Sequence, residues 1–171
     1  MIILEGIDGT GKTAIANFLE NKGMKKFHYD YDPSNCDLES KYLKPILNYN
    51  DNYIMDRSFI SELVYGPVIR NSCRINKAQL ERIIKAYANK NVYIIYLTAE
   101  KNILLKRRKD NINDYQNIET YYEGLNKRYK KVMNVMKNYF DVKEIDTSEL
   151  KDNELCKMVE GLINERYNIC R

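Results

Sequence analysis

Short apolar runs alternate with longer amphipathic stretches along the whole chain. This alternation is typical of a parallel β-sheet whose faces are covered by helices. The expected strands are residues 2–5, 26–31, 53–56, 92–97 and 142–145. The pattern therefore predicts an α/β fold with a five-stranded parallel sheet.

Helical periodicity is clearest in three segments, in which apolar residues recur at every third or fourth position. The three stripes are Leu80, Ile83, Ile84 and Tyr87, then Ile118, Tyr122, Leu125, Tyr129, Val132, Met133 and Met136, then Leu155, Met158, Val159, Leu162 and Ile163. We interpret them as core faces, because burial against a sheet demands this spacing. A further helix is expected over residues 12–21.

Composition fits one folded unit, since 44% of the 171 residues are apolar and 30% are charged. The longest apolar run, residues 92–97, is far shorter than the roughly 20 residues of a membrane-spanning helix. The N-terminus reaches Glu5 too early for a signal peptide, which needs about 7 to 15 apolar residues. We therefore expect a single domain over residues 1–171, no membrane partner and a cytoplasmic location.

Basic residues are concentrated in one segment of a chain whose net charge is only +4. Residues 101–131 contain nine lysines and arginines against four acidic residues, which favours an anionic ligand for this segment. The 15 tyrosines do not indicate a nucleic-acid surface, because several fall on the core stripes. The four cysteines form no CxxC pair, which argues against a zinc site or a disulfide framework.

One glycine-rich motif carries the strongest chemical signal. The segment Gly6-Ile7-Asp8-Gly9-Thr10-Gly11-Lys12-Thr13 fits G-x-x-x-x-G-K-[ST] and lies between the first expected strand and the first expected helix. Its backbone amides and the helix N-terminus would form an anion site. We expect this segment to bind ATP, with Lys12 at the β and γ phosphates and Thr13 holding Mg²⁺. Lys12 is expected to be exposed in the loop and to contact ligand rather than core.

The third expected strand ends in Asp56-Arg57-Ser58. We expect Asp56 to coordinate Mg²⁺, with a salt bridge to Arg57 as the structural alternative. The chain lacks the D-x-x-G and N-K-x-D motifs of GTPases, and no second acid follows Asp56 as in motor ATPases. Hydrolysis is therefore disfavoured, and Arg57 would suit an anionic phosphoryl acceptor.

The P-loop, Asp56-Arg57-Ser58 and the arginine-bearing segment after residues 92–97 together resemble the thymidylate kinase family and its deoxynucleoside kinase relatives. The resemblance runs over most of the chain. It implies the P-loop NTPase fold, three α/β/α layers with a helical lid at about residues 106–117. It also implies phosphoryl transfer from ATP to a deoxynucleoside monophosphate, converting dTMP to dTDP, and suggests a homodimer.

The resemblance assigns acceptor-binding roles to Asp8, Asp32, Arg57 and Tyr65. Asp8 matches the P-loop acid that contacts the acceptor sugar, and Asp32 belongs to an acid–proline pair after the second strand. Tyr65 lies in a stretch similar to the one that lines the acceptor pocket.

Two departures from the family pattern affect these assignments. Gly9 occupies the place of a P-loop arginine found in one subgroup, so the catalytic cation is expected from Arg107 or Arg108. Both could instead belong to a solvated helix face. The chain also lacks length between residues 33 and 53, where the family usually places its base-reading residues, so base identity is left open.

Three alternatives remain from the sequence. A deoxynucleoside kinase would phosphorylate a neutral 5′-hydroxyl and use Asp30 or Asp32 as general base. A P-loop switch or nucleic-acid-binding ATPase would use the basic segment to contact phosphates. His28 shares a predicted strand face with both aspartates, which indicates either a metal site or the polar face of an edge strand.

Overall fold

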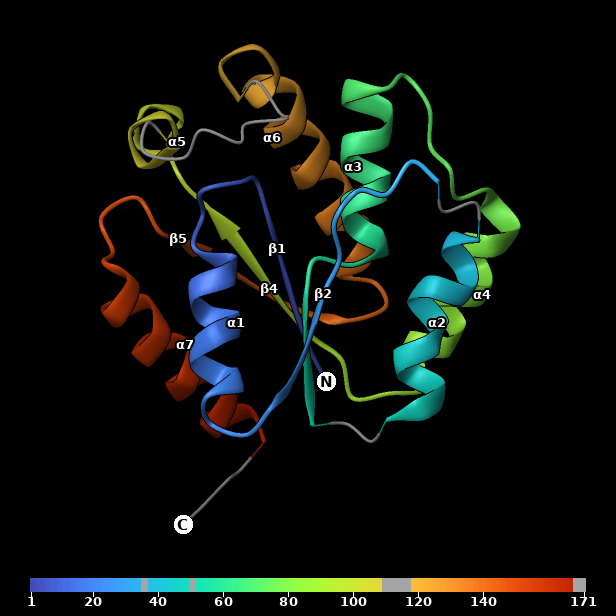
Figure 1. Ribbon diagram of the computed structural model, residues 1–171, viewed down its shortest axis with the longest axis horizontal. Helices are drawn as coiled ribbons and strands as arrows, with labels where there is room; N and C mark the ends of the chain where they lie inside the picture. Colours follow the sequence, from blue (N-terminus) through green and yellow to red (C-terminus); the bar gives the residue numbers. More distant parts are fainter. Residues whose placement is uncertain (35–36, 50–51, 109–117, 168–171) are drawn as a thin grey trace.

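The computed structural model describes residues 1–34, 37–49, 52–108 and 118–167 (Figure 1). Its strands are β1 (Ile2–Gly6), β2 (Lys25–His28), β3 (Tyr53–Asp56), β4 (Tyr93–Thr98) and β5 (Asp141–Asp146). Its helices are α1 (Lys12–Glu20), α2 (Leu38–Asn48), α3 (Phe59–Ile69), α4 (Lys77–Ala88), α5 (Lys101–Arg108), α6 (Ile118–Met136) and α7 (Asp152–Arg166). Residues 106–108 of the expected lid end α5, and residues 109–117 lie outside the described part of the chain.

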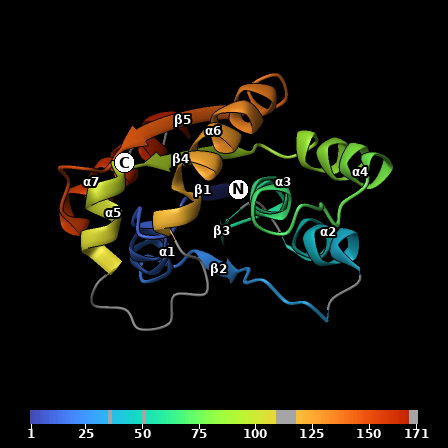
Figure 2. The same cartoon turned by 90° about the horizontal axis from the view of Figure 1, so that it is seen from above.

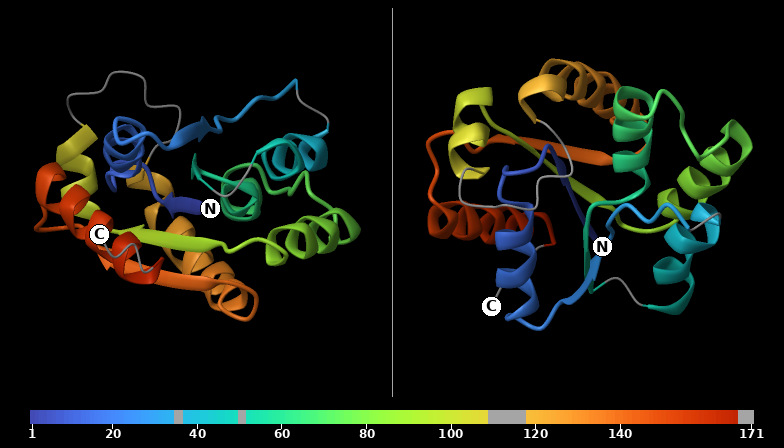
Figure 3. Two further views of the ribbon diagram at one scale, coloured as in Figure 1. Left: turned by 90° about the horizontal axis from the view of Figure 1, so that it is seen from below. Right: turned by 45° about the horizontal axis from the view of Figure 1, so that its top comes forward.

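All five strands are parallel and follow the order β2-β3-β1-β4-β5, which confirms the predicted sheet. Side chains of β1 enter two separate cores because successive residues of a strand point to opposite faces. Ile3 belongs to the core that contains residues of α2, α3, α4 and α6, whereas Ile2 and Leu4 belong to the core that contains residues of α1 and α7. Figure 2 shows the sheet between these two helical layers, and the views in Figure 3 show α2 and α4 side by side beyond α3.

Burial confirms most of the predicted helical stripes. In α6, Leu125, Tyr129 and Met133 are buried, and in α4 the buried positions are Ile83 and Tyr87.

The prediction for α7 is wrong at Met158, which is 43% exposed. The buried side of this helix includes Cys156 and Val159, so its stripe is shifted away from Met158.

No helix in the described ranges is long and apolar enough to cross a bilayer.

Strand β2 is shorter than the sequence predicts, ending at His28 rather than at Tyr31. Among the described strands it stands at the edge of the sheet and pairs with β3. The last register pair joins His28 to Asp56. Arg57, the residue after β3, has a φ of 73°, which turns the backbone out of the strand. The amide of Tyr29 still donates to the carbonyl of Asp56 at 3.1 Å, and the pairing of β2 with β3 ends there.

Candidate active site

The P-loop leaves β1 at the carboxyl edge of the sheet. Gly6 has a φ of +148°, and a Cβ there would lie 2.3 Å from the carbonyl oxygen of Leu97, so only glycine lets β1 turn beside β4. The Thr10 hydroxyl donates to the carbonyl of Ile7 at 2.8 Å and closes the loop. Helix α1 then begins at Lys12. Its free N-terminal amides make this end of the helix an anion-binding site.

Lys12 is buried, which corrects the expectation of an exposed side chain. It is 5% exposed, and its Nζ donates to the carbonyls of Gly6 at 2.8 Å and Ile7 at 2.9 Å. Burial lowers the pKa of Lys12 to about 8. The ammonium group therefore lies inside the loop, and a phosphate group that enters the loop could replace the two carbonyl oxygens as its partner.

Asp56 and Thr13 have the chemistry of a magnesium site. The Thr13 hydroxyl donates to Asp56 Oδ2 at 2.9 Å, joining the start of α1 to the end of β3. Asp56 is fully buried, and among the described residues no group donates a hydrogen bond to its Oδ1. A carboxylate oxygen and a hydroxyl are hard oxygen ligands, which Mg²⁺ prefers. The two side chains therefore fit Mg²⁺ or one of its coordinated waters.

His28 links this carboxylate to the loop after β2. Its Nδ1 lies 2.9 Å from Asp56 Oδ2, and its Nε2 lies 2.9 Å from Asp30 Oδ1. In the part of the chain that the structure describes, no group of three His, Cys, Asp or Glu side chains could hold a metal ion. The edge-strand interpretation of His28 therefore fits better than a metal site of its own.

Arg57 pairs with Asp8, so the alternative of an Asp56–Arg57 salt bridge is wrong. Arg57 Nη2 donates to Asp8 Oδ1, and its guanidinium lies 5.6 Å from the ring centre of Tyr65. Burial alone would raise the pKa of Asp8, but the charges of Arg57 and Lys12 outweigh it and hold the pKa below its usual value. Asp8 is therefore an anion surrounded by the cations that a phosphate would need.

Arg107 and Arg108 have different environments, although the sequence does not distinguish them. Arg108 Nη1 lies 3.6 Å from Asp8 Oδ2. Its Cγ lies 3.6 Å from the position that a Cβ on Gly9 would take, so its side chain passes beside the P-loop where Gly9 leaves space. Arg108 thus supplies a cation close to the place of the P-loop arginine.

Arg107 instead connects α5 to the loop after β5. It donates to the carbonyl of Gly9 at 3.2 Å, to Thr147 Oγ1 at 3.1 Å, and to the carbonyls of Thr147 at 2.5 Å and Leu150 at 3.3 Å. These four hydrogen bonds hold the Arg107 guanidinium in place, so we assign Arg107 a structural role. Neither arginine belongs to a purely solvated helix face.

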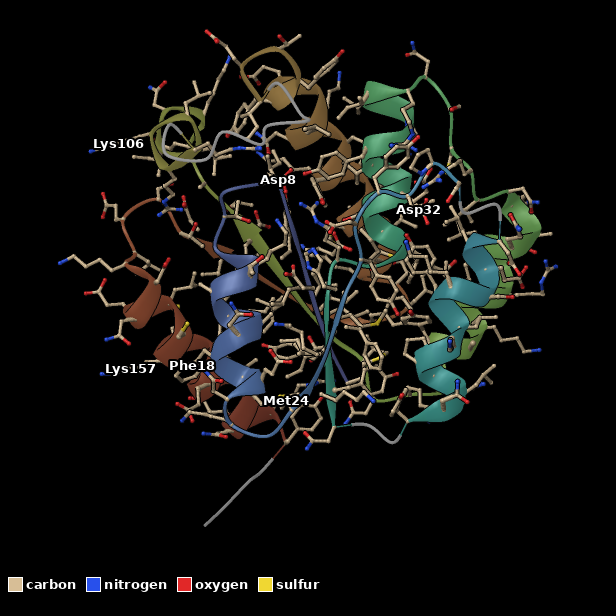
Figure 4. The ribbon with its side chains drawn as sticks, viewed as in Figure 1. Asp8, Phe18, Met24, Asp32, Lys106 and Lys157 are labelled. Atoms are coloured by element: carbon tan, nitrogen blue, oxygen red, sulfur yellow. The ribbon has the colours of Figure 1, made fainter. Side chains whose placement is uncertain are left out.

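A cleft along α3 opens next to Arg57. Its lining residues are Tyr29, Asp30, Tyr31, Tyr42, Arg57, Ser61, Glu62, Tyr65, Arg70 and Arg74. Tyr65 and Arg57 therefore lie on the same cleft. Asp32 is exposed outside this lining, and its carboxylate accepts from the Ser34 amide at 2.9 Å and hydroxyl at 2.6 Å. Figure 4 shows Asp8 at the P-loop, Asp32 beside α3, and Lys106 pointing away from both.

Glu5 is a positioning residue that the sequence reasoning missed. It is fully buried and accepts from Ser58 N and Oγ at 2.7 Å each, from Ser61 Oγ at 2.7 Å and from Tyr129 OH at 3.1 Å. Burial raises its pKa, although the serine hydrogen bonds oppose the shift. Because Ser58 caps α3 and follows Arg57, Glu5 fixes the turn that carries the arginine. In the sequence, the only local indication of this role is that Glu5 is an acidic residue at the end of an apolar strand.

The P-loop, the Asp56–Thr13 pair and the arginines beside the cleft along α3 fit a P-loop nucleotide kinase. A protein of Acidianus bottle-shaped virus, named as a thymidylate kinase, is 31% identical over 105 residues, covering 56% of this chain and 67% of the viral one. A protein of Staphylothermus marinus, also named as a thymidylate kinase, is 31% identical over 135 residues, covering 63% of this chain and 67% of its own. The chain belongs to the thymidylate kinase family.

Solved structures share the fold over nearly the whole chain. The YorR protein of Bacillus subtilis, in complex with phosphorylated GDP, has a TM-score of 0.78 at 23% identity and covers 99% of both chains. Deoxyadenosine kinase of M. mycoides with bound dCTP has a TM-score of 0.65 at 20% identity, covering 96% of this chain and 100% of its own. No protein-family model matches the sequence. The resemblance to the P-loop kinase fold is thus confirmed.

Proposed function

We propose that this kinase transfers the γ-phosphoryl group of ATP to the 5′-phosphate of a deoxynucleoside monophosphate, with dTMP as the first candidate acceptor. The observation that carries the proposal is the position of Arg57. It lines the acceptor cleft, while its guanidinium pairs with Asp8 of the P-loop. A cation between the two substrates suits an acceptor that is itself an anion.

Two side chains would act on the donor nucleotide. Lys12 exchanges its carbonyl partners for the β and γ phosphates, and Arg108 moves from Asp8 to the transferring group. Thr13 and Asp56 would hold Mg²⁺, which when bound neutralises phosphate charge. In this reaction, positioning and charge stabilisation supply most of the rate enhancement, because phosphoryl transfer needs little covalent help from protein groups.

Two other side chains would act on the acceptor. Arg57 exchanges Asp8 for the acceptor phosphate, and its planar guanidinium can donate two parallel hydrogen bonds to phosphate oxygens. Asp8 then becomes available for the hydroxyl of the acceptor sugar, the role that the family resemblance gives it. The ion pair between Arg57 and Asp8 therefore keeps both groups charged and in place until substrate arrives.

A deoxynucleoside kinase is the second candidate, and the position of Asp30 favours it. Asp30 lines the acceptor cleft and lies 2.9 Å from His28 Nε2, so a carboxylate is available to accept a proton from a sugar hydroxyl. In that reaction Arg57 would bind no acceptor phosphate.

Replacing Arg57 by lysine separates the two candidates. We expect Arg57→Lys to weaken dTMP as an acceptor by about 1.5 to 3 kcal/mol in kcat/KM, the range of hydrogen bonds to charged groups. The substitution keeps the charge but removes the planar fork. Steady-state kinetics with dTMP and with thymidine measure the effect.

The matched control for this experiment is Arg82→Lys. Arg82 lies on α4 and makes a two-point contact with Glu39, with Nε–Oε1 at 2.5 Å and Nη2–Oε2 at 2.7 Å, outside the cleft lining. The Arg82→Lys substitution should leave kcat/KM unchanged for both dTMP and thymidine. If Arg57→Lys lowered kcat/KM equally for dTMP and thymidine, Arg57 would not bind an acceptor phosphate and the monophosphate assignment would be wrong.

A further inference from the structure

Strand β2 brings His28 beside Asp56 on the side of the sheet that faces α1. The two residues are register partners at the ends of β2 and β3. Successive side chains of a strand point to opposite faces. Phe27 packs against the core on the α3 side of the sheet, whereas Lys26 donates to Asn17 Oδ1 of α1 at 2.7 Å. His28 points to the same face as Lys26, so its ring lies on the face that α1 covers.

The two carboxylate oxygens of Asp56 have different surroundings. Oδ2 lies 2.9 Å from Thr13 Oγ1 and 2.9 Å from His28 Nδ1. A carboxylate oxygen accepts hydrogen bonds, so the hydroxyl and the ring nitrogen are the donors. Oδ1 is inaccessible to solvent, and no group in the described ranges donates to it. A buried acceptor without a donor is unfavourable, and a cation or one of its coordinated waters would supply the missing partner.

His28 is itself held at its other ring nitrogen. Its Nε2 lies 2.9 Å from Oδ1 of Asp30, which lines the cleft along α3. With a carboxylate at each nitrogen, the ring keeps both contacts only in one orientation. His28 is therefore a fixed link between the Asp56–Thr13 pair and the cleft.

This fixed ring restricts the rotation of the Asp56 carboxylate. The torsion that turns a carboxylate about its Cβ–Cγ bond has a broad energy minimum. One hydrogen bond to Oδ2, from Thr13, would leave much of that freedom. A second donor on the same oxygen, from His28, limits it and so fixes the direction of Oδ1.

We propose that His28 is a positioning residue of the metal site, which holds Asp56 so that Oδ1 faces Mg²⁺ or one of its coordinated waters. His28 acts through Asp56 and is not a ligand, because it contacts the oxygen that the Thr13 hydroxyl also contacts. Partners of this kind typically contribute about 10- to 100-fold to metal affinity or activity. The inference rests on the proposed function, since both require a metal ion at Thr13 and Asp56.

Binding of Mn²⁺ to the protein with saturating ADP and no acceptor tests this inference without turnover. Mn²⁺ shares the preference of Mg²⁺ for oxygen ligands, and electron paramagnetic resonance measures the free ion. We expect His28→Phe, which keeps a ring but removes both nitrogens, to weaken Mn²⁺ binding to the protein–ADP complex by about tenfold or more. An unchanged Mn²⁺ affinity in folded His28→Phe would overturn the inference. So would wild-type protein that adds nothing to the Mn²⁺ affinity of free ADP.

Two amide variants separate the two contacts of the ring. His28→Asn keeps an N–H near the position of Nδ1, and it should recover most of the Mn²⁺ affinity. His28→Gln keeps an N–H near the position of Nε2 and loses the contact with Asp56, so it should weaken Mn²⁺ binding as much as His28→Phe does. It replaces His28→Phe if the phenylalanine variant folds poorly. Equal weakening in the asparagine and glutamine variants would contradict the assignment to Nδ1.

Lys26→Met is the matched control on the same face of β2. Lys26 pairs with Glu20 at 2.6 Å and with Asn17, both on α1, and it has no contact with Asp56 among the described interactions. Its loss should leave Mn²⁺ affinity unchanged. If Lys26→Met weakened Mn²⁺ binding as much as His28→Phe, the effect would come from the packing of β2 and the inference would be wrong.

Kinetics distinguish positioning of the metal from general damage. In His28→Phe the concentration of Mg²⁺ that gives half-maximal turnover should rise about tenfold, while kcat at saturating Mg²⁺ should fall less. A fall in kcat with an unchanged Mg²⁺ requirement would contradict the positioning role.

A transfer assay with dTMP keeps the inference separate from the proposed function. If Mn²⁺ binding follows the expected order of variants but no monophosphate is phosphorylated, the proposed function fails and the role of His28 stands. If dTMP is phosphorylated and Mn²⁺ affinity does not depend on His28, the inference fails and the proposed function stands.

Discussion

Replacing Arg108 by methionine is expected to lower kcat by about 10³-fold or more, the effect of an arginine supplied to a phosphoryl-transfer transition state. The KM for ATP should change by less than about tenfold, because the contribution is made mainly in the transition state. Arg108 approaches Asp8 Oδ2 to 3.6 Å and passes beside Gly9, so its charge lies next to the anion of the P-loop. Steady-state kinetics with varied ATP measure both quantities.

Arg107→Met is the matched control for this prediction. Its four hydrogen bonds join α5 to Gly9, Thr147 and Leu150, so its loss should lower thermal stability and reduce kcat less than the loss of Arg108. A larger fall in kcat for Arg107→Met, with Arg108→Met near wild type, would reverse the two roles. Equal losses of binding and turnover in Arg108→Met would make Arg108 a substrate-binding group.

Lys12→Met is expected to lower kcat by about 10³-fold, the upper range for removing one charge-stabilising group from a phosphoryl-transfer site. It should lower the free energy of unfolding by less than the about 1–3 kcal/mol expected for carbonyls that lose a buried donor. Removing the ammonium also removes the cost of burying it, which is the cause of its lowered pKa. The sequence alone predicts unchanged stability, because it places Lys12 in an exposed loop. Turnover assays and urea unfolding of the ligand-free protein measure the two effects.

Lys157→Met on α7 is the matched lysine control, because Lys157 is exposed and lies far from the P-loop (Figure 4). It should change neither turnover nor stability. If Lys12→Met kept a near-normal kcat, Lys12 would not take part in phosphoryl transfer and this prediction would be wrong.

The fold was predictable because its signals are local. Continuous apolar runs such as residues 53–56 and 92–97 mark strands buried on both faces, and the P-loop must follow a strand and begin a helix. The sequence also placed Asp56 at the edge of the sheet that carries the P-loop, because the carboxyl ends of parallel strands meet there. The sequence pattern predicted the end of β2 three residues too late. The strand ends where its partner β3 turns away at Arg57, and that turn cannot be read from the residues of β2 itself.

The missed parts of the site depend on contacts between distant segments. Glu5 is recognisable only when α3 brings Ser58 and Ser61 against it, and His28 contacts Asp56 only when β2 pairs with β3. Arg107 and Arg108 are adjacent in the chain, but successive helical residues point about 100° apart. Because of this rotation, the side chain of Arg107 contacts the loop after β5, whereas that of Arg108 approaches Asp8.

The central claim is most directly tested by the products that one mixture forms. The protein would be incubated with ATP, Mg²⁺ and equal concentrations of deoxynucleosides and their 5′-monophosphates, and the products identified by mass spectrometry. The account predicts ADP and deoxynucleoside diphosphates in equal amounts, with dTDP among them, and unchanged nucleosides. Phosphorylation of a free nucleoside faster than every monophosphate, or release of phosphate without any acceptor product, would contradict it.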